Sequence, residues 1–205
     1  MTIIGPGCGS SGGDGTPNTA PVITSHASVT VEENVTVALT VTANDAQGQI
    51  PIYSLNGGAD QTIFSIKNYT GVLSFIIAPD YEAPADDNSD NVYEVQVAVS
   101  DGARHTTQDI TVAVTNINDD PTGSVTIDYT TPAEGDTLTA SNTLADEDGL
   151  GTLTYTWKAN GSTVGTGSTY TLTQSEVGKT ITVEASYTDG QGNPETVASA
   201  ATDAV

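Results

Sequence analysis

The sequence is poor in cysteine, basic residues and aromatic side chains. Its 205 residues include one Cys, four Lys+Arg, one Trp, eight Tyr and two Phe. A single cysteine excludes an intramolecular disulfide framework and a zinc site built from cysteines. No apolar run approaches 18 residues, so the sequence predicts no transmembrane span.

The charge is strongly one-sided, with 26 Asp+Glu and a formal net charge of −22. Such a polyanion repels nucleic acid and anionic membranes, and we expect neither as a partner. His26 and His105 are isolated in the sequence, and no nucleophile motif accompanies them. The chain is therefore predicted not to be an enzyme.

What is abundant is Val and Thr alternating with period two, which is typical of half-buried β-strands. The alternating segments of the first half are 29–31, 35–41, 72–75, 92–99 and 110–114. Those of the second half are 125–127, 138–140, 153–157, 170–172, 181–185 and 196–198. Short strands with turn residues every 8–14 residues predict an all-β fold of two tandem Greek-key sandwiches.

Three parts are expected along the chain. Residues 1–20 are rich in Gly, Ser and Pro and predict a flexible tether. Turn formers and a proline at 116–121 interrupt the strand pattern. We therefore place one domain at 21–121 and a second at 122–205.

Acidic and amide residues follow the strands of the first domain in a particular order. They are Glu33, the Asn44–Gly48 turn, the Phe64–Phe75 stretch with Thr70 and Gly71, Asp80-Tyr81-Glu82, Asp101-Gly102 and Asn116–Pro121. This order over about 90 residues resembles the cadherin repeat. Two positions depart from that pattern, because Asp45-Ala46-Gln47-Gly48 has lost one carboxylate and Asn116 replaces an aspartate. Amide oxygens still bind Ca²⁺, so these losses weaken the implied sites without abolishing them.

The resemblance implies calcium, and sandwich geometry indicates where. We expect loops of both domains to converge on the linker and to form an all-oxygen Ca²⁺ site that stiffens the joint. Its candidate ligands are Glu33, Asp80, Glu82, Asn118, Asp119, Asp146, Asp148 and Asp189. A second, weaker cluster is expected from Asp45 and Asp101 beside Asn18–Pro21. The alternative is that these acids are ordinary solvated turn residues.

The second domain resembles instead the immunoglobulin-like repeats of bacterial surface adhesins. The resemblance lies in segments 135–139, 144–157, 170–183 and 187–190, and Trp157 occupies the third strand, where such sandwiches bury a tryptophan. These repeats usually occur in arrays, so we expect the chain to be a piece of a longer protein.

The leading interpretation is a calcium-binding structural or adhesive module of a bacterial extracellular or cell-surface protein. Its expected partners are other copies or neighbouring repeats. One alternative is a carbohydrate-binding module, with Tyr53, Tyr69 and Tyr81 as candidates, although each is expected to cover a core edge. Another is a filament subunit that donates Thr2–Ile4 to a neighbour. Cys8, in a Gly/Ser-rich context, is a candidate for a lipid anchor.

Overall fold

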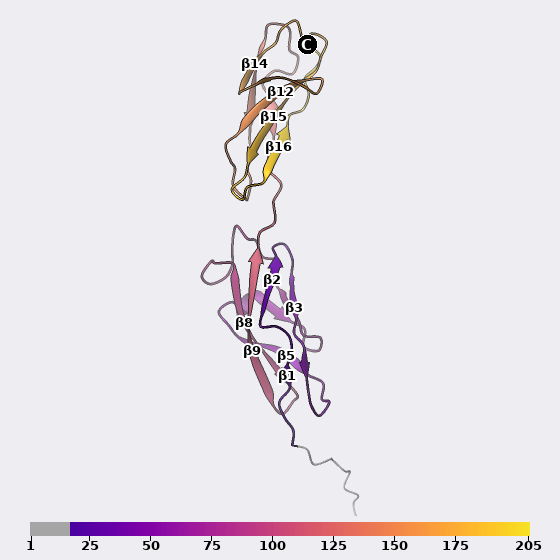
Figure 1. Ribbon diagram of the computed structural model, residues 1–205, viewed down its shortest axis with the longest axis vertical. Helices are drawn as coiled ribbons and strands as arrows, with labels where there is room; N and C mark the ends of the chain where they lie inside the picture. The colour runs from indigo at the N-terminus through magenta and orange to yellow at the C-terminus, as the bar shows by residue number, and fades with distance from the viewer. Residues whose placement is uncertain (1–16) are drawn as a thin grey trace, which may run out of the picture. The chain divides into compact units, whose positions relative to one another are not determined.

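The computed structural model describes residues 17–205. The chain forms two compact units, the first ending at Asn116 and the second beginning at Ile117 (Figure 1). The domain boundary expected at Pro121 thus lies five residues beyond the point where the units divide.

Within the described residues 17–116, unit 1 contains nine strands and one short 3-10 helix. They are β1 (Val22–Ile23), β2 (Ser28–Glu32), β3 (Val37–Thr40), β4 (Ala43–Asn44), β5 (Ile52–Gly57), η1 (Gln61–Ile63), β6 (Phe64–Ile66), β7 (Val72–Phe75), β8 (Val92–Ser100) and β9 (His105–Thr115). The larger sheet has the order β2-β9-β8-β5, and a second sheet has the order β3-β7-β6. Strands β1 and β4 form a separate two-stranded ribbon.

The pairing of β9 brings distant parts of the chain to the same end of unit 1. β2 runs parallel to β9, with Ser28 opposite Thr111 and Glu32 opposite Thr115. Glu33 and Asn116, the residues after these strands, therefore leave the sheet at the same end. β8 runs antiparallel to β9, so its first residue, Val92, lies toward this end as well.

The two sheets of unit 1 enclose an apolar core. Alternation along β8 buries Tyr93, Val95, Val97 and Val99, as a period-two strand pattern requires. The ring of Tyr93 stands edge-on to Phe75, with ring centroids 5.1 Å apart. Edge-to-face packing of this kind adds to the stabilisation that burial provides.

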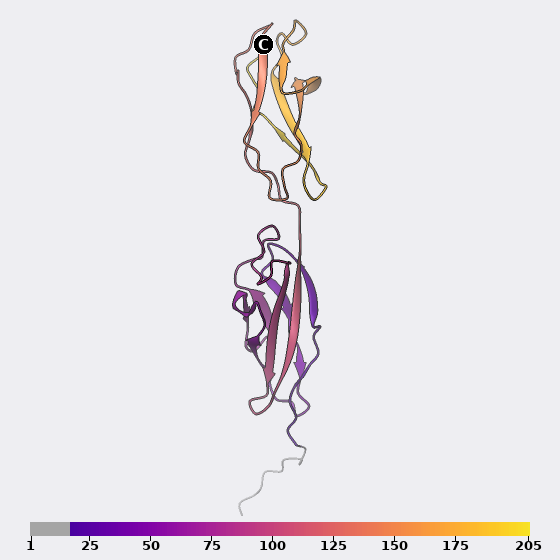
Figure 2. The same ribbon diagram turned by 90° about the vertical axis from the view of Figure 1, so that its left-hand side faces the viewer.

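Unit 2 contains seven strands. They are β10 (Val125–Ile127), β11 (Thr137–Asn142), β12 (Thr154–Ala159), β13 (Ser162–Thr166), β14 (Thr169–Thr171), β15 (Ile181–Thr188) and β16 (Pro194–Ala198). One sheet has the order β10-β11-β14 and the other the order β13-β12-β15-β16 (Figure 2). Thr122 forms an isolated antiparallel bridge with Ala145.

Trp157 lies at the centre of the core of unit 2. It belongs to the third strand of the unit and is 0% exposed. Its ring stacks on Tyr170 at a centroid distance of 6.1 Å, and its indole N–H donates to the carbonyl of Gly167 at 2.8 Å. The buried polar atom of the indole is thereby satisfied, as a stable core requires.

The all-β prediction is confirmed, and each alternating segment contains or overlaps a strand of the structure. Strands β1, β4, β5, β6 and β13 were not predicted. β5 is the longest of these, and it runs into Asn56-Gly57, which the sequence indicates as a turn. Residues 17–205 include no helix of the length and apolar character needed to cross a membrane.

Candidate metal centre

Glu33 is a buried carboxylate at the end of β2. Its side chain is 2% exposed, and its Oε2 accepts a hydrogen bond from the backbone N of Tyr81 at 2.8 Å. The next residue, Asn34, has a positive φ of 62° and donates its backbone N–H to Pro79 at 2.9 Å. This turn and the segment 79–81 hold Glu33 against the Asp80-Tyr81-Glu82 motif.

Glu82 brings a second carboxylate to the same place. One of its carboxylate oxygens lies within 4.8 Å of one from Glu33. Its Oε1 also accepts a hydrogen bond from the side-chain amide of Asn116 at 2.6 Å. Unit 1 therefore gathers Glu33, Glu82 and Asn116, which were all expected in the calcium-binding pattern, from three separate segments.

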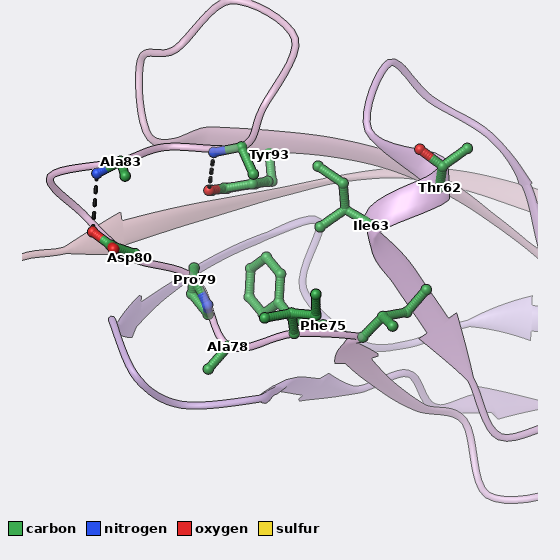
Figure 3. Close-up of a pocket in the computed structure, with 11 residues that line it drawn as sticks. Thr62, Ile63, Phe75, Ala78, Pro79, Asp80, Ala83 and Tyr93 are labelled. Carbon is green, nitrogen blue, oxygen red and sulfur yellow. Dashed lines mark hydrogen bonds between the residues drawn. The ribbon is translucent and has the colours of Figure 1, made fainter.

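Asp80 belongs to the same motif but lies differently. Its Oδ1 accepts a hydrogen bond from the backbone N of Ala83 at 2.9 Å and closes its own turn, as Figure 3 shows. Its side chain is exposed, whereas that of Glu33 is buried. Asp80 thus stabilises the loop that carries Glu82.

The basic residues of unit 1 lie toward the other end of the sandwich. They are Lys67 and Arg104. Arg104 lies in the turn between β8 and β9, and the nine residues of β8 span about 30 Å from that turn. Bringing two carboxylates close together in a partly buried place raises their mutual repulsion, which a cation would relieve.

Unit 2 has an acidic end of its own, formed by the linker and two loops. The backbone N of Asp119 donates to Oδ2 of Asp148 at 2.8 Å. The side-chain amide of Asn118 donates to Oε1 of Glu195 at 2.9 Å. Asp148 is 5% exposed, and its carbonyl accepts from the N of Gly190, beside Asp189. The linker residues and the predicted acids Asp148 and Asp189 therefore lie together within this unit.

The remaining predicted acid of unit 2 is Asp146. Its Oδ1 accepts from the N of Asp148 at 2.9 Å, and the hydroxyl of Tyr187 donates to its Oδ2. Burial, together with this hydrogen bond and the negative charge of Asp146, raises the pKa of Tyr187 well above its usual value. Tyr187 therefore remains a proton donor to Asp146 across the physiological pH range.

Asp189 organises the loop between β15 and β16. Its Oδ1 accepts from the backbone N of Gln191 at 2.9 Å and of Asn193 at 2.7 Å. Burial opposes ionisation, but the hydrogen bonds from Asn193, Gly192 and Gln191 outweigh it and lower the pKa of Asp189. The carboxylate is therefore ionised at neutral pH.

The turns of the second predicted cluster both contact segment 17–19, at the end of unit 1 where β1 begins. The Asn18 amide donates to Oδ2 of Asp101 at 2.9 Å. Gln47, two residues after Asp45, accepts from the N of Thr19 at 3.3 Å. Hydrogen bonds from Arg104 and Ala103 lower the pKa of Asp101. Segment 17–19 thus links the turns that hold Asp45 and Asp101, although residues 1–20 were expected to form a tether.

An apolar pocket lies behind the Asp80 turn. It has a volume of about 360 Å³ and is lined chiefly by Ile63, Phe75, Ile76, Ile77 and Tyr93 (Figure 3). Ile77 is 80% exposed at its rim. The pocket presents apolar surface next to the turn.

The tyrosines proposed for carbohydrate binding do not form one surface. Tyr53 is buried and Tyr81 packs on the core, as expected for side chains that cover a core edge. The same expectation is wrong for Tyr69, which is 77% exposed because it lies in the tight turn between β6 and β7. Cys8 and Thr2–Ile4, the candidates for lipidation and strand donation, lie outside the described residues.

Sequence reasoning missed several residues that organise these sites. They are Tyr81, whose backbone N holds Glu33, Glu195, which binds Asn118, and Tyr187, which binds Asp146. Tyr187-Thr-Asp189 is visible as a motif, but only the three-dimensional pairing shows that its tyrosine faces Asp146. A backbone donor such as that of Tyr81 carries no signal in the sequence.

No protein-family model matches the sequence, and no curated protein matches it.

The structural neighbours are cadherin ectodomain repeats. A crystal structure of human protocadherin-24 EC1-2 (form II) has 21% sequence identity and a TM-score of 0.52, covering 90% of this chain and 95% of that one. Another crystal structure of human protocadherin-24 EC1-2 has 19% identity and a TM-score of 0.49 over the same shares. Drosophila N-cadherin EC1-4 has 15% identity and a TM-score of 0.48, covering 89% of this chain and 48% of that one. The first of these similarities supports a cadherin-like fold.

Proposed function

We propose that this chain is a calcium-binding, non-enzymatic module of a bacterial extracellular or cell-surface protein, with a structural or adhesive role. The observation that carries the proposal is the approach of a Glu33 carboxylate oxygen to within 4.8 Å of one from Glu82. The cadherin-like fold agrees with this role. The bacterial context rests on the resemblance of the second domain to adhesin repeats.

The donor set fits Ca²⁺. Glu33 and Glu82 supply carboxylate oxygens, Asn116 supplies an amide group, and no sulfur or imidazole ligand takes part. Calcium accepts six to eight such oxygens in flexible geometry, whereas Mg²⁺ demands a tight octahedron and retains its waters. When bound, the ion would supply positive charge between the carboxylates.

The residues around the site position these ligands. The backbone N of Tyr81 fixes the Glu33 carboxylate, and the Asn116 amide fixes that of Glu82. Asn116 is also the residue at which the chain leaves unit 1. A cation bound here would hold the exit of the chain against the Glu33 turn, and we propose that it thereby stiffens the joint between the domains.

The test is thermal unfolding of the full chain in EDTA and in millimolar Ca²⁺. A ligand at 100 times its Kd stabilises the folded state by about 2.7 kcal/mol, so the melting temperature should rise by several degrees. Glu33→Gln should remove most of this increase. Glu32→Gln makes the same chemical change at the exposed neighbouring position and should leave it intact. An unchanged melting temperature of the native chain would overturn the proposal.

The adhesive role requires a separate measurement. If other copies of the chain are its partners, sedimentation in Ca²⁺ should show reversible association that EDTA removes. Glu33→Gln should then sediment as the EDTA-treated chain does. A chain that stays monomeric at high concentration in Ca²⁺ would contradict self-association but would leave the structural role in place.

A further inference from the structure

The loop between the Asp80 turn and β8 is acidic and was not among the predicted sites. Its residues 85–91, the 85–91 loop, read Ala-Asp-Asp-Asn-Ser-Asp-Asn. In Figure 3 the chain between Ala83 and Tyr93 forms a loop beside the apolar pocket. The carboxylates of an acidic loop are usually exposed to water and bind no ion. Whether this loop binds a ligand therefore depends on which of its carboxylates are buried.

Asp86 is the buried aspartate of this loop, whereas Asp87 and Asp90 are exposed. Its side chain is 5% exposed, and its Oδ2 accepts a hydrogen bond from the backbone N of Asp90 at 2.8 Å. The carboxylate therefore points into the turn of its own loop. Its other oxygen, Oδ1, is buried and has no hydrogen-bond partner among residues 17–205. A buried carboxylate oxygen without a donor costs free energy unless a cation or water satisfies it.

Other oxygen acceptors lie within this loop and at its base. Asp60, at 2% exposure, accepts from the N of Asp87 at 2.8 Å and so anchors the base of the loop. Asp90 accepts from the N of Val92 at 2.9 Å. Oδ1 of Asn91 is a second buried oxygen that lacks a hydrogen-bond partner among the described residues. The loop thus contains two buried side-chain oxygens that no hydrogen-bond donor among residues 17–205 satisfies.

No basic side chain of this part of the sequence can compensate these charges. Residues 68–103 contain no Lys, Arg or His. The hydroxyl of Tyr93 accepts a hydrogen bond from the N of Ala85 at 3.2 Å. Burial raises the pKa of Tyr93, and the negative charges of Asp86, Asp60 and Asp80 raise it further. Three carboxylates therefore act on one buried hydroxyl.

We propose that the 85–91 loop binds a divalent cation, Ca²⁺, with Oδ1 of Asp86 as its anchoring ligand. Asp90 and Asn91 are the further residues of the loop whose side-chain oxygens would bind the cation. All the ligand atoms that this irregular loop offers are oxygens, which suits the variable coordination geometry of calcium better than the strict octahedron of magnesium or the nitrogen and sulfur ligands of transition metals. The carboxylates of this site differ from those of Glu33 and Glu82, so each site can be removed without altering the ligands of the other.

The test is a Ca²⁺ titration of the ¹⁵N-labelled full chain, starting in EDTA and followed by backbone NMR. The amides of residues 86–91 should shift and approach saturation by about 10 mM, ten times the Kd of about 1 mM at the weak end of extracellular calcium modules. Asp86→Asn should weaken the binding reported by these amides about tenfold or more, because a charged ligand becomes neutral. Asp87→Asn removes the same charge from an exposed neighbour and should leave the affinity within about twofold.

A second readout is Tb³⁺ luminescence excited through tyrosine. In the Glu33→Gln/Glu82→Gln chain, Tb³⁺ should still emit, and Tyr93→Phe in that background should reduce the emission severalfold. If Asp86→Asn does not give a folded spectrum, Asp90→Asn replaces it, and the same weakening is expected.

The outcomes separate the two calcium proposals. If residues 86–91 do not shift up to about 10 mM Ca²⁺, or if Asp87→Asn weakens binding as much as Asp86→Asn, the loop is satisfied by water and the inference is wrong. A response at Asn34 and Tyr81 alone would support the Glu33/Glu82 site and overturn the loop site. A response at 86–91 alone would do the reverse.

Discussion

The carboxylate of Glu176 accepts two hydrogen bonds from one residue, Thr173. The backbone N of Thr173 lies 2.9 Å from Oε2 of Glu176 and its hydroxyl lies 2.8 Å from the same oxygen. The bond from the backbone N of Thr173 to the Glu176 carboxylate is one half of a helix capping box, yet here it closes a turn between β14 and β15. These two bonds from Thr173, chiefly the one from its backbone N, lower the pKa of Glu176 despite its burial.

Glu176→Gln should destabilise unit 2 in a pH-dependent way. A carboxyl whose pKa is lowered by folding stabilises the native state above its unfolded pKa, which for Glu is about 4.3, and this stabilisation disappears as the pH falls through the folded pKa. Urea unfolding should show a loss of about 1 kcal/mol at pH 7 that vanishes at acidic pH. Glu134→Gln, at an exposed position, should show no such difference.

Trp157→Phe should destabilise unit 2 even though an aromatic ring remains. The smaller ring leaves a cavity in a site of 0% exposure and removes the donor to the Gly167 carbonyl. Together these losses should amount to about 2–4 kcal/mol. Far-UV circular dichroism during urea unfolding measures this in both chains, because the variant has lost its only tryptophan. Tyr129→Phe, at a surface position that is 54% exposed, serves as the control and should change stability by less than about 0.5 kcal/mol.

Gly71→Ala should be far more damaging than Gly48→Ala. Both glycines have positive φ, 68° and 78°, so both substitutions strain the backbone alike. A Cβ at Gly71 would lie 2.1 Å from the carbonyl oxygen of Val41, whereas one at Gly48 meets nothing within 4 Å. We expect about 1–2 kcal/mol for Gly48→Ala and a larger loss for Gly71→Ala. Equal losses in thermal unfolding would show that the backbone relaxes away from the clash.

Asp101→Asn should abolish a weak calcium-binding event. This event is distinct from the one that Glu33→Gln removes. Asn18 binds Asp101, and Oδ2 of Asp45 is buried without a hydrogen-bond partner in the described part of the chain. If this cluster binds Ca²⁺, isothermal titration of the native chain should resolve a weaker event that Asp101→Asn abolishes. Asp109→Asn, at an exposed position on β9, should retain that event. A native titration without the weaker event would contradict a site at this end.

The fold was largely predictable because apolar residues recur with period two along its long strands. β8 reads Val-Tyr-Glu-Val-Gln-Val-Ala-Val-Ser and buries Tyr93, Val95, Val97 and Val99, as its pattern predicts. β5 and β13 were missed because they contain Gly, Ser, Thr and Asn, which are also turn residues. These residues interrupt the apolar alternation, so the sequence does not distinguish the two strands from loops.

The candidate sites were predictable only as far as local motifs extend. Glu33 and the Asp80-Tyr81-Glu82 motif could be identified from their order along the chain. The burial of Asp86 could not, because it depends on how the 85–91 loop folds around the backbone N of Asp90 and rests on Asp60, 27 residues from Asp87 in the sequence. Nothing in Ala-Asp-Asp-Asn distinguishes the buried aspartate from its exposed neighbour.

The parallel pairing of β2 with β9 has a mechanical consequence for unit 1. β2 lies near the start of this unit and β9 at its end, and five residue pairs join them, from Ser28–Thr111 to Glu32–Thr115. Tension on the two ends of the unit, once transmitted past β1, pulls the beginning of β2 against the end of β9, along the strands and across their hydrogen bonds. These bonds share the load and must break together. Unit 1 is therefore arranged to bear a pulling force in shear.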